Sequence, residues 1–175
     1  MNVTTRVDED LADLGEALST IAARLDALPT DFSLLIYTDS KYGDIVHPAA
    51  ELLHEKTERL WYVFTTSRPR LYRVVDVRNV TDAIWSLGAW GCVSLIGLPT
   101  KHAHRVLSAV RNHEYRVTCG PEWTSSLLDA LDEGTSFFEI STDTDSESFL
   151  VACYTQDIPT MIRESLDSIG LPVNH

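Results

Sequence analysis

The feature that most constrains the fold is the alternation of strand-like and helix-like segments from residue 32 onward. The strand-like runs cover residues 32–38, 60–66, 71–77 and 92–98. Segments with apolar residues at i, i+3 and i+4 follow three of these runs, at residues 48–59, 80–87 and 101–112. Strands that alternate with helices of about a dozen residues are typical of βαβ units. We therefore expect an α/β fold, a three-layer Rossmann-like sandwich with a mostly parallel sheet.

The C-terminal third suggests one departure from a purely parallel sheet. Residues 136–142 and 148–155 are strand-like and flank the acidic turn at residues 143–147. This arrangement predicts a hairpin or two neighbouring strands, so we expect an antiparallel strand at one edge. Further helices are predicted at residues 121–133 and 158–169, each beginning close to a proline.

The first thirty residues carry an unusually regular apolar stripe that predicts an amphipathic helix. Its members alternate in steps of three and four, the a/d pattern of a heptad: Leu11, Leu14, Leu18, Ile21, Leu25 and Leu28. Two interpretations stay open, a helix packed on its own domain or a seam for a dimer or a protein partner. We divide the chain into this helix, residues 1–30, and a single α/β domain, residues 31–175.

The charge balance is strongly acidic, with 26 acidic against 14 basic residues and a formal net charge of -12. Either the chain binds a cationic partner, or its surface is of the halophilic type, adapted to a concentrated-salt cytoplasm where charge repulsion is screened. The scarcity of lysine and the spread of acidic residues favour the second interpretation, although a general arginine bias would also explain the scarcity. The start of the chain lacks a signal-peptide pattern, and no apolar run reaches the roughly 20 residues of a membrane span. We expect a cytoplasmic protein without membrane contact.

Motifs for the common chemistries are missing from the sequence. There is no P-loop, no G-x-G-x-x-G and no G-x-S-x-G. Cys92, Cys119 and Cys153 form no C-x-x-C pair, and the histidines lack the spacing of a shared metal site. These absences exclude the common enzyme classes and favour a non-catalytic protein, although they do not exclude every enzyme. We expect no cofactor and no bound metal.

The strand ends provide the alternative prediction, a ligand site. In parallel α/β sheets, ligands bind beyond the carboxyl ends of the strands. Six polar residues occupy such ends in the expected fold: Asp39, Ser40, Lys41, Arg68, Thr100 and Lys101. They would suit an anionic or phosphorylated small molecule, because Lys, Arg and a helix start attract anions.

Two functional hypotheses follow from these observations. The first is a non-catalytic regulatory or protein-interaction module that forms a homodimer, or docks on a partner, through the N-terminal stripe. The alternative is a small-molecule binding protein or enzyme that uses the strand-end residues. Nucleic-acid binding ranks last, although arginines gather at Arg68, Arg70, Arg73 and Arg78, because an acidic protein in high salt gains little from phosphate contacts.

Overall fold

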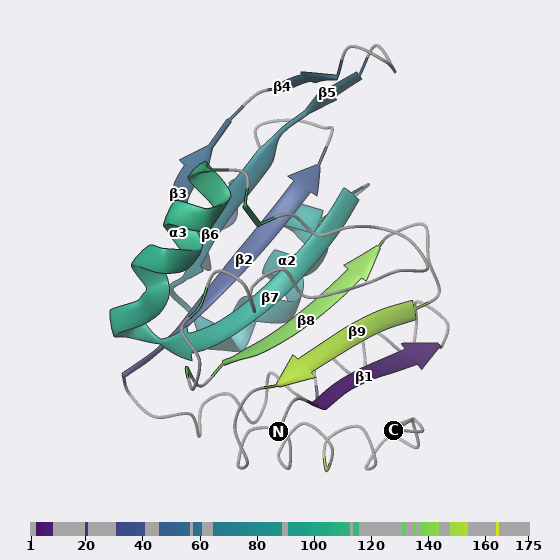
Figure 1. The fold of residues 1–175 in the computed structure, drawn as a ribbon, viewed down its shortest axis with the longest axis vertical. Helices are drawn as coiled ribbons and strands as arrows, with labels where there is room; N and C mark the ends of the chain where they lie inside the picture. Colours follow the sequence, from purple (N-terminus) through teal and green to yellow (C-terminus); the bar gives the residue numbers. More distant parts are fainter. Residues whose placement is uncertain are drawn as a thin grey trace.

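The main body of the protein is an open seven-stranded sheet (Figure 1). The computed structural model describes residues 3–8, 20, 31–40, 46–56, 58–60, 65–88, 91–112, 114–115, 131, 135, 137–143, 148–153 and 164. In spatial order the strands are β1 (Val3–Asp8), β9 (Ser148–Cys153), β8 (Phe138–Asp143), β7 (Gly91–Pro99), β2 (Phe32–Ser40), β6 (Pro69–Val74) and β3 (Ala50–Glu55). Two short strands, β4 (Glu58–Leu60) and β5 (Thr65–Ser67), pair with each other and extend the β3–β6 hairpin past the sheet.

Every strand pairing in the described residues is antiparallel, so the expected Rossmann-like, mostly parallel sandwich is wrong. Helix α2 (Val80–Gly88) does connect two strands that run in the same direction, β6 and β7. However, β2 lies between them and is antiparallel to both. The order of strand, helix and strand along the chain does not show that β2, an earlier strand, lies between β6 and β7. Because β2 separates them, β6 and β7 do not pair as parallel neighbours.

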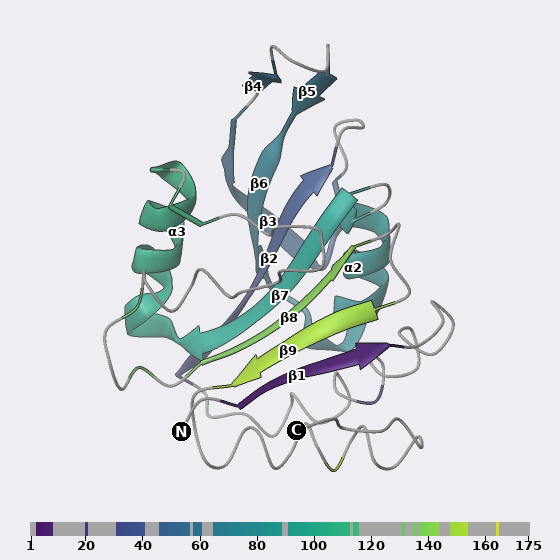
Figure 2. The same cartoon turned by 45° about the vertical axis from the view of Figure 1, so that its right-hand side comes forward.

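The two helices of at least nine residues in the described part cover opposite faces of the sheet (Figure 2). Helix α3 (Ala103–Arg111) packs over β3 and β6, whereas α2 packs over β2 and β7. Alternate residues of β2 therefore enter two cores. Leu35 and Tyr37 belong to the cluster beneath α3. On the other face, the Thr38 hydroxyl donates to the carbonyl of Leu87 in α2 at 3.1 Å.

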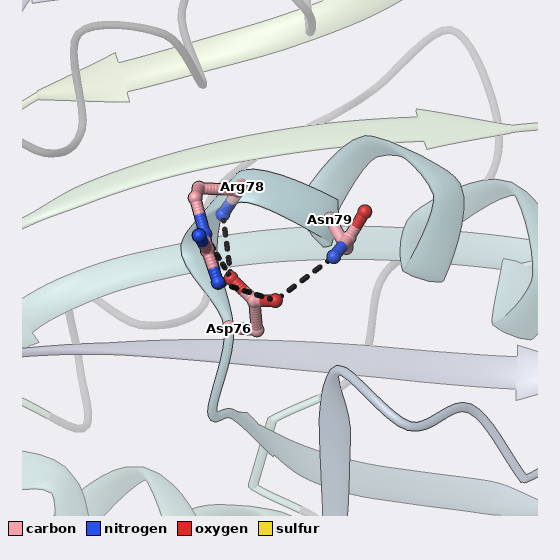
Figure 3. Close-up of polar contacts among 3 residues, drawn as sticks. All are labelled: Asp76, Arg78 and Asn79. Atoms are coloured by element: carbon pink, nitrogen blue, oxygen red, sulfur yellow. Dashed lines mark hydrogen bonds and ion pairs between the residues drawn. The ribbon is translucent and has the colours of Figure 1, made fainter.

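The start of α2 is defined by the side chain of Asp76 (Figure 3). Asp76 caps the short 3-10 helix η1 (Val77–Asn79), which leads into α2, and its Oδ1 accepts from the backbone N–H of Arg78 at 3.2 Å. Its Oδ2 accepts from the Asn79 side-chain amide at 2.8 Å. The hydrogen bond from the Arg78 side chain, followed by that from Asn79, lowers the pKa of Asp76 below its ordinary value. Asp76 was not predicted from the sequence as this cap.

The amphipathic patterns of both helices are confirmed. Val80, Ile84 and Leu87 of α2 are buried. In α3, Val106 and Val110 are buried, and Ala103 and Leu107 pack against the same cluster. The 3-10 helix η2 (Thr100–His102) comes immediately before α3.

The expected helix at residues 48–59 is wrong, because the structure has strands β3 and β4 there. Of the expected strand at residues 60–66, the described residues belong to β4 and β5, and residues 61–64 lie outside the described part. The hairpin expected near residues 136–155 is confirmed as β8 and β9. Strand β1, which pairs with β9 at one edge of the sheet, was not expected. In the described residues, no helix combines the length and apolar character needed to cross a membrane.

Candidate functional site

The strand-end residues singled out for ligand binding lie at two ends of the sheet. Asp39 and Ser40 end β2, and Asp39 is opposite Pro69, next to Arg68. Thr100 and Lys101 follow Pro99, which is opposite Phe32 at the other end of β2. Phe32 and Asp39 are seven positions apart along β2, which separates the two groups by about 23 Å. In an antiparallel sheet the carboxyl ends of neighbouring strands lie at opposite ends of the sheet. The expectation that ligands bind where the carboxyl ends of parallel strands meet therefore does not bring these residues together. Lys41 lies outside the described residues.

Thr100 takes part in local contacts that anchor the turn before α3. Its backbone N–H donates to the carbonyl of Asp31 at 2.6 Å, and its hydroxyl lies 2.8 Å from that of Ser33. Lys101 is exposed. This arrangement ties the start of η2 to the start of β2, which is a structural role. The leucine stripe proposed for dimerisation falls on residues 11–28 and lies outside the described part of the chain.

A buried polar cluster beneath α3 was missed by the sequence analysis. Glu139 in β8 is 3 % exposed, and its Oε1 accepts hydrogen bonds from the hydroxyls of Ser94, Ser141 and Tyr115 at 2.9, 2.9 and 2.6 Å. The two serine hydroxyls are 2.8 Å apart. The ring of Tyr37 packs edge-on against Tyr115, with 5.0 Å between the ring centroids. The alternation of Glu139 and Ser141 with the apolar Phe138 and Ile140 in β8 was the available signal.

The cluster is closed to solvent and acts as an internal cross-link. Ser94, Ser141 and Tyr115 are all buried. Burial, followed by the charge of Glu139, raises the pKa of Tyr115 well above its ordinary value. The hydrogen bonds of Glu139 join β7, β8 and the segment that follows α3, so the cluster fixes the helix over the sheet. No group of three or more His, Cys, Asp or Glu side chains suited to a metal ion occurs among the described residues.

The outer margin of β3 has a different character. It is formed by β3, the turn before it, and β6 with the residue that follows it, and we call it the β3 margin (residues 46–56 and 69–75). β3 is the last strand of the sheet, and within the described part of the chain it pairs with β6 alone. The large hydrophobic side chains exposed by the described residues all belong to this margin: Val46 at 88 %, Leu52 at 49 % and Val75 at 57 %.

Charge is locally balanced on the β3 margin. The Nε of Arg73 donates to Oε2 of Glu51 at 3.2 Å, and the Nε of Arg70 donates to Oε2 of Glu55 at 3.1 Å. Each of these carboxylates of β3 therefore has an arginine of β6 as its partner. The exposed pair of Glu51 and Arg73 contributes little to stability, whereas Arg70 of the other pair is buried. The effect of both pairs here is to cancel charge on one edge of a protein whose net charge is -12.

The turn that leads into β3 is fixed by His47. The backbone N–H of Ala49 donates to Nδ1 of His47 at 3.2 Å, and Nε2 of the same ring lies 3.0 Å from Oδ2 of Asp82 in α2. Because Nδ1 is the acceptor, Nε2 carries the proton and donates to Asp82. The ring thus joins the entry of β3 to α2 and holds the start of the edge strand in place.

Comparison of this chain with protein-family models, with curated proteins and with solved structures found no match.

Proposed function

We propose that this chain is a non-catalytic protein-interaction module that self-associates in the cytosol. The observation that carries the proposal is the β3 margin, where exposed apolar side chains and balanced charge meet at an unpaired edge of the described sheet. Exposed apolar groups that gather in one place are typical of interaction sites, whereas single scattered ones are ordinary. An open strand edge also offers a row of backbone donors and acceptors to another chain.

The acidity of the whole chain supports placing the contact on this margin. Two copies with a net charge of -12 each repel one another wherever their acidic faces meet. The pairing of Glu51 with Arg73 and of Glu55 with Arg70 reduces that repulsion at the β3 margin. The leucine stripe at residues 11–28 remains a second proposed contact, argued from the sequence alone.

The ligand-binding alternative has weaker support. Of its six residues, Asp39, Ser40 and Arg68 belong to one end of the sheet, and Thr100 and Lys101 to the other. A small anion bound at one end would meet three of the six residues, and at the other end two. A ligand screen by thermal shift, with phosphorylated metabolites and nucleotides in molar KCl, should give no stabilisation if the interaction proposal holds.

Self-association is tested by light scattering coupled to size-exclusion chromatography on the full chain in molar KCl. We expect a mass that corresponds to a dimer and that falls toward the monomer on dilution. A monomer at every concentration studied would refute self-association. A Leu18→Asp variant shows which of the two surfaces forms the dimer contact. It should abolish the dimer if the leucine stripe forms the contact, and it should leave the dimer unchanged if the β3 margin does.

A further inference from the structure

The backbone of β3 shows which of its residues offer hydrogen bonds to a further strand. Ala49 and Lys56 both face β6, since the N–H of Val75 donates to Ala49 and that of Lys56 donates to Pro69. In a strand, the backbone groups of successive residues point to opposite sides. Ala49 and Lys56 are seven positions apart, an odd number, yet both face β6, and this requires one irregularity between them. The bulge between Leu52 and His54 supplies it. Leu52 and Glu55 therefore direct their backbone groups outward. Ala50 also faces outward but offers its carbonyl, because its N–H donates to the carbonyl of His47 at 3.0 Å.

The side chains of these residues also divide regularly between the two faces. Ala50, Leu52 and Glu55 lie opposite Val74, Tyr72 and Arg70, which places them on the face of the sheet that α2 covers. Glu51 and His54 lie opposite Arg73 and Leu71, on the face of α3. Leu53, the extra residue of the bulge, packs into the core beneath α3.

We propose that a second copy of this chain pairs with β3 antiparallel, about a two-fold axis at Leu52, so that two seven-stranded sheets join into one. The proposal rests on the self-association proposed above and names its surface. In this register the outward residues meet one another: Leu52 lies opposite Leu52 of the second copy, and Ala50 opposite its Glu55. Two-fold contacts of this self-complementary kind are the commonest in homo-oligomers.

The side chains fit this register. Glu51 of one copy faces the bulge of the second copy, so its carboxylate lies across from the imidazole of the second copy's His54. The two-fold axis produces the same contact between Glu51 of the second copy and His54 of the first. The two Leu52 side chains meet on the face of α2 and bury each other's exposed surface. A register centred one residue earlier would oppose Glu51 to Glu51 and would bring inward-facing backbone groups to the interface. The charge pattern and the backbone therefore select the same arrangement.

The register is tested by disulfide cross-linking of single cysteine variants in the full chain. Hydrogen-bonded residues directly opposite each other in an antiparallel pair have Cα atoms about 5.5 Å apart, within the range of a disulfide. Leu52→Cys should therefore form a covalent dimer under mild oxidation. Glu51→Cys is the matched control, because it is similarly exposed but faces His54 of the second copy. The parent protein under the same oxidant gives the background from the three native cysteines.

A second variant measures the contact without oxidation. Leu52→Lys adds two positive charges at the two-fold axis and should raise the dimer dissociation constant at least about tenfold. Ser108→Lys, on the exposed side of α3, adds the same charge away from β3 and should leave dimerisation unchanged. Because Leu52 is half exposed in the single chain, the variant should fold, which far-UV circular dichroism verifies.

The outcomes separate this inference from the proposed function. A dimeric parent, a monomeric Leu52→Lys variant and selective cross-linking at residue 52 support the two-fold contact. A parent that stays dimeric after Leu52→Lys, with no selective cross-linking, overturns the β3 contact and leaves self-association to another surface. A monomeric parent overturns self-association itself. Stronger cross-linking of Glu51→Cys than of Leu52→Cys overturns the register.

Discussion

Gly97 in β7 lies opposite Phe138 in β8, and the phenyl ring occupies the space into which a Cβ at residue 97 would project. Phe138 is fully buried, so the ring has no room to move aside. The glycine is thus required by a close approach, and the aromatic ring supplies the packing that the glycine lacks. Nothing in the sequence distinguished this glycine from those in turns.

We predict that Gly97→Ala lowers the free energy of unfolding by about 1–3 kcal/mol, the usual cost of overpacking a core. Urea denaturation monitored by circular dichroism measures it. In a Phe138→Ala background the same substitution should cost much less, because the obstructing ring is gone. An equal cost in the two backgrounds would show that the ring is not the cause.

Tyr115 provides a second test at the residue scale. Its hydroxyl donates to buried Glu139, so Tyr115→Phe should lower the free energy of unfolding by about 1–3 kcal/mol at neutral pH. The raised pKa of Tyr115 adds a dependence on pH. Below the ordinary tyrosine pKa of about 10 the stabilisation is complete, and it is lost as pH rises from there through the higher pKa of the folded state.

The measurement is the urea midpoint of the parent and of Tyr115→Phe, in buffers spanning the alkaline range. The parent should lose stability more steeply than the variant above about pH 10. Parallel profiles for the two proteins would contradict the raised pKa.

At the scale of elements, α2, α3 and the β8–β9 hairpin were predicted from the sequence because their patterns are strong and local. The prediction of a helix at residues 50–55 was wrong for the opposite reason. Ala, Glu and Leu are good helix formers, yet this segment is a strand because it pairs with β6 and matches Glu51 and Glu55 to arginines there. The partner strand lies nearly twenty residues further along the chain, and local propensity carries no information about it. For the same reason, neither the order of the strands nor the buried cluster at Glu139 could be predicted from local patterns in the sequence.

The cap of η1 gives a prediction for an element. Asp76→Ala removes the acceptor for the Arg78 backbone and should lower the melting temperature at neutral pH. Because the folded-state pKa of Asp76 is lowered, its stabilisation is present above the ordinary aspartate pKa of about 4 and is lost as pH falls through the lower value. The melting temperatures of parent and variant should therefore converge in acid. A constant difference down to the lowest pH at which both fold would contradict the role of the ionised carboxylate.

At the scale of the whole molecule, net charge and sheet topology act together. A chain with a net charge of -12 is stabilised by screening, which shortens the Debye length from about 10 Å at 0.1 M salt to about 3 Å at 1 M. The open β3 edge is the part of the described sheet where apolar surface and balanced charge coincide. Salt should therefore favour both folding and association.

We predict a higher melting temperature and a smaller dimer dissociation constant in molar KCl than in dilute buffer. Differential scanning calorimetry and sedimentation equilibrium measure the two quantities. A neutral osmolyte such as sucrose is the control, because it strengthens burial without screening charge. If sucrose reproduced the effect of KCl on the dissociation constant, charge repulsion would not be the cause.

The most direct test of the central claim, self-association through the β3 edge, compares the mass in solution of the parent, Leu52→Lys and Ser108→Lys by light scattering in molar KCl. We predict dimers for the parent and for Ser108→Lys and a monomer for Leu52→Lys. A dimer that persists in Leu52→Lys would contradict the β3 contact, and a parent that is monomeric would contradict self-association altogether.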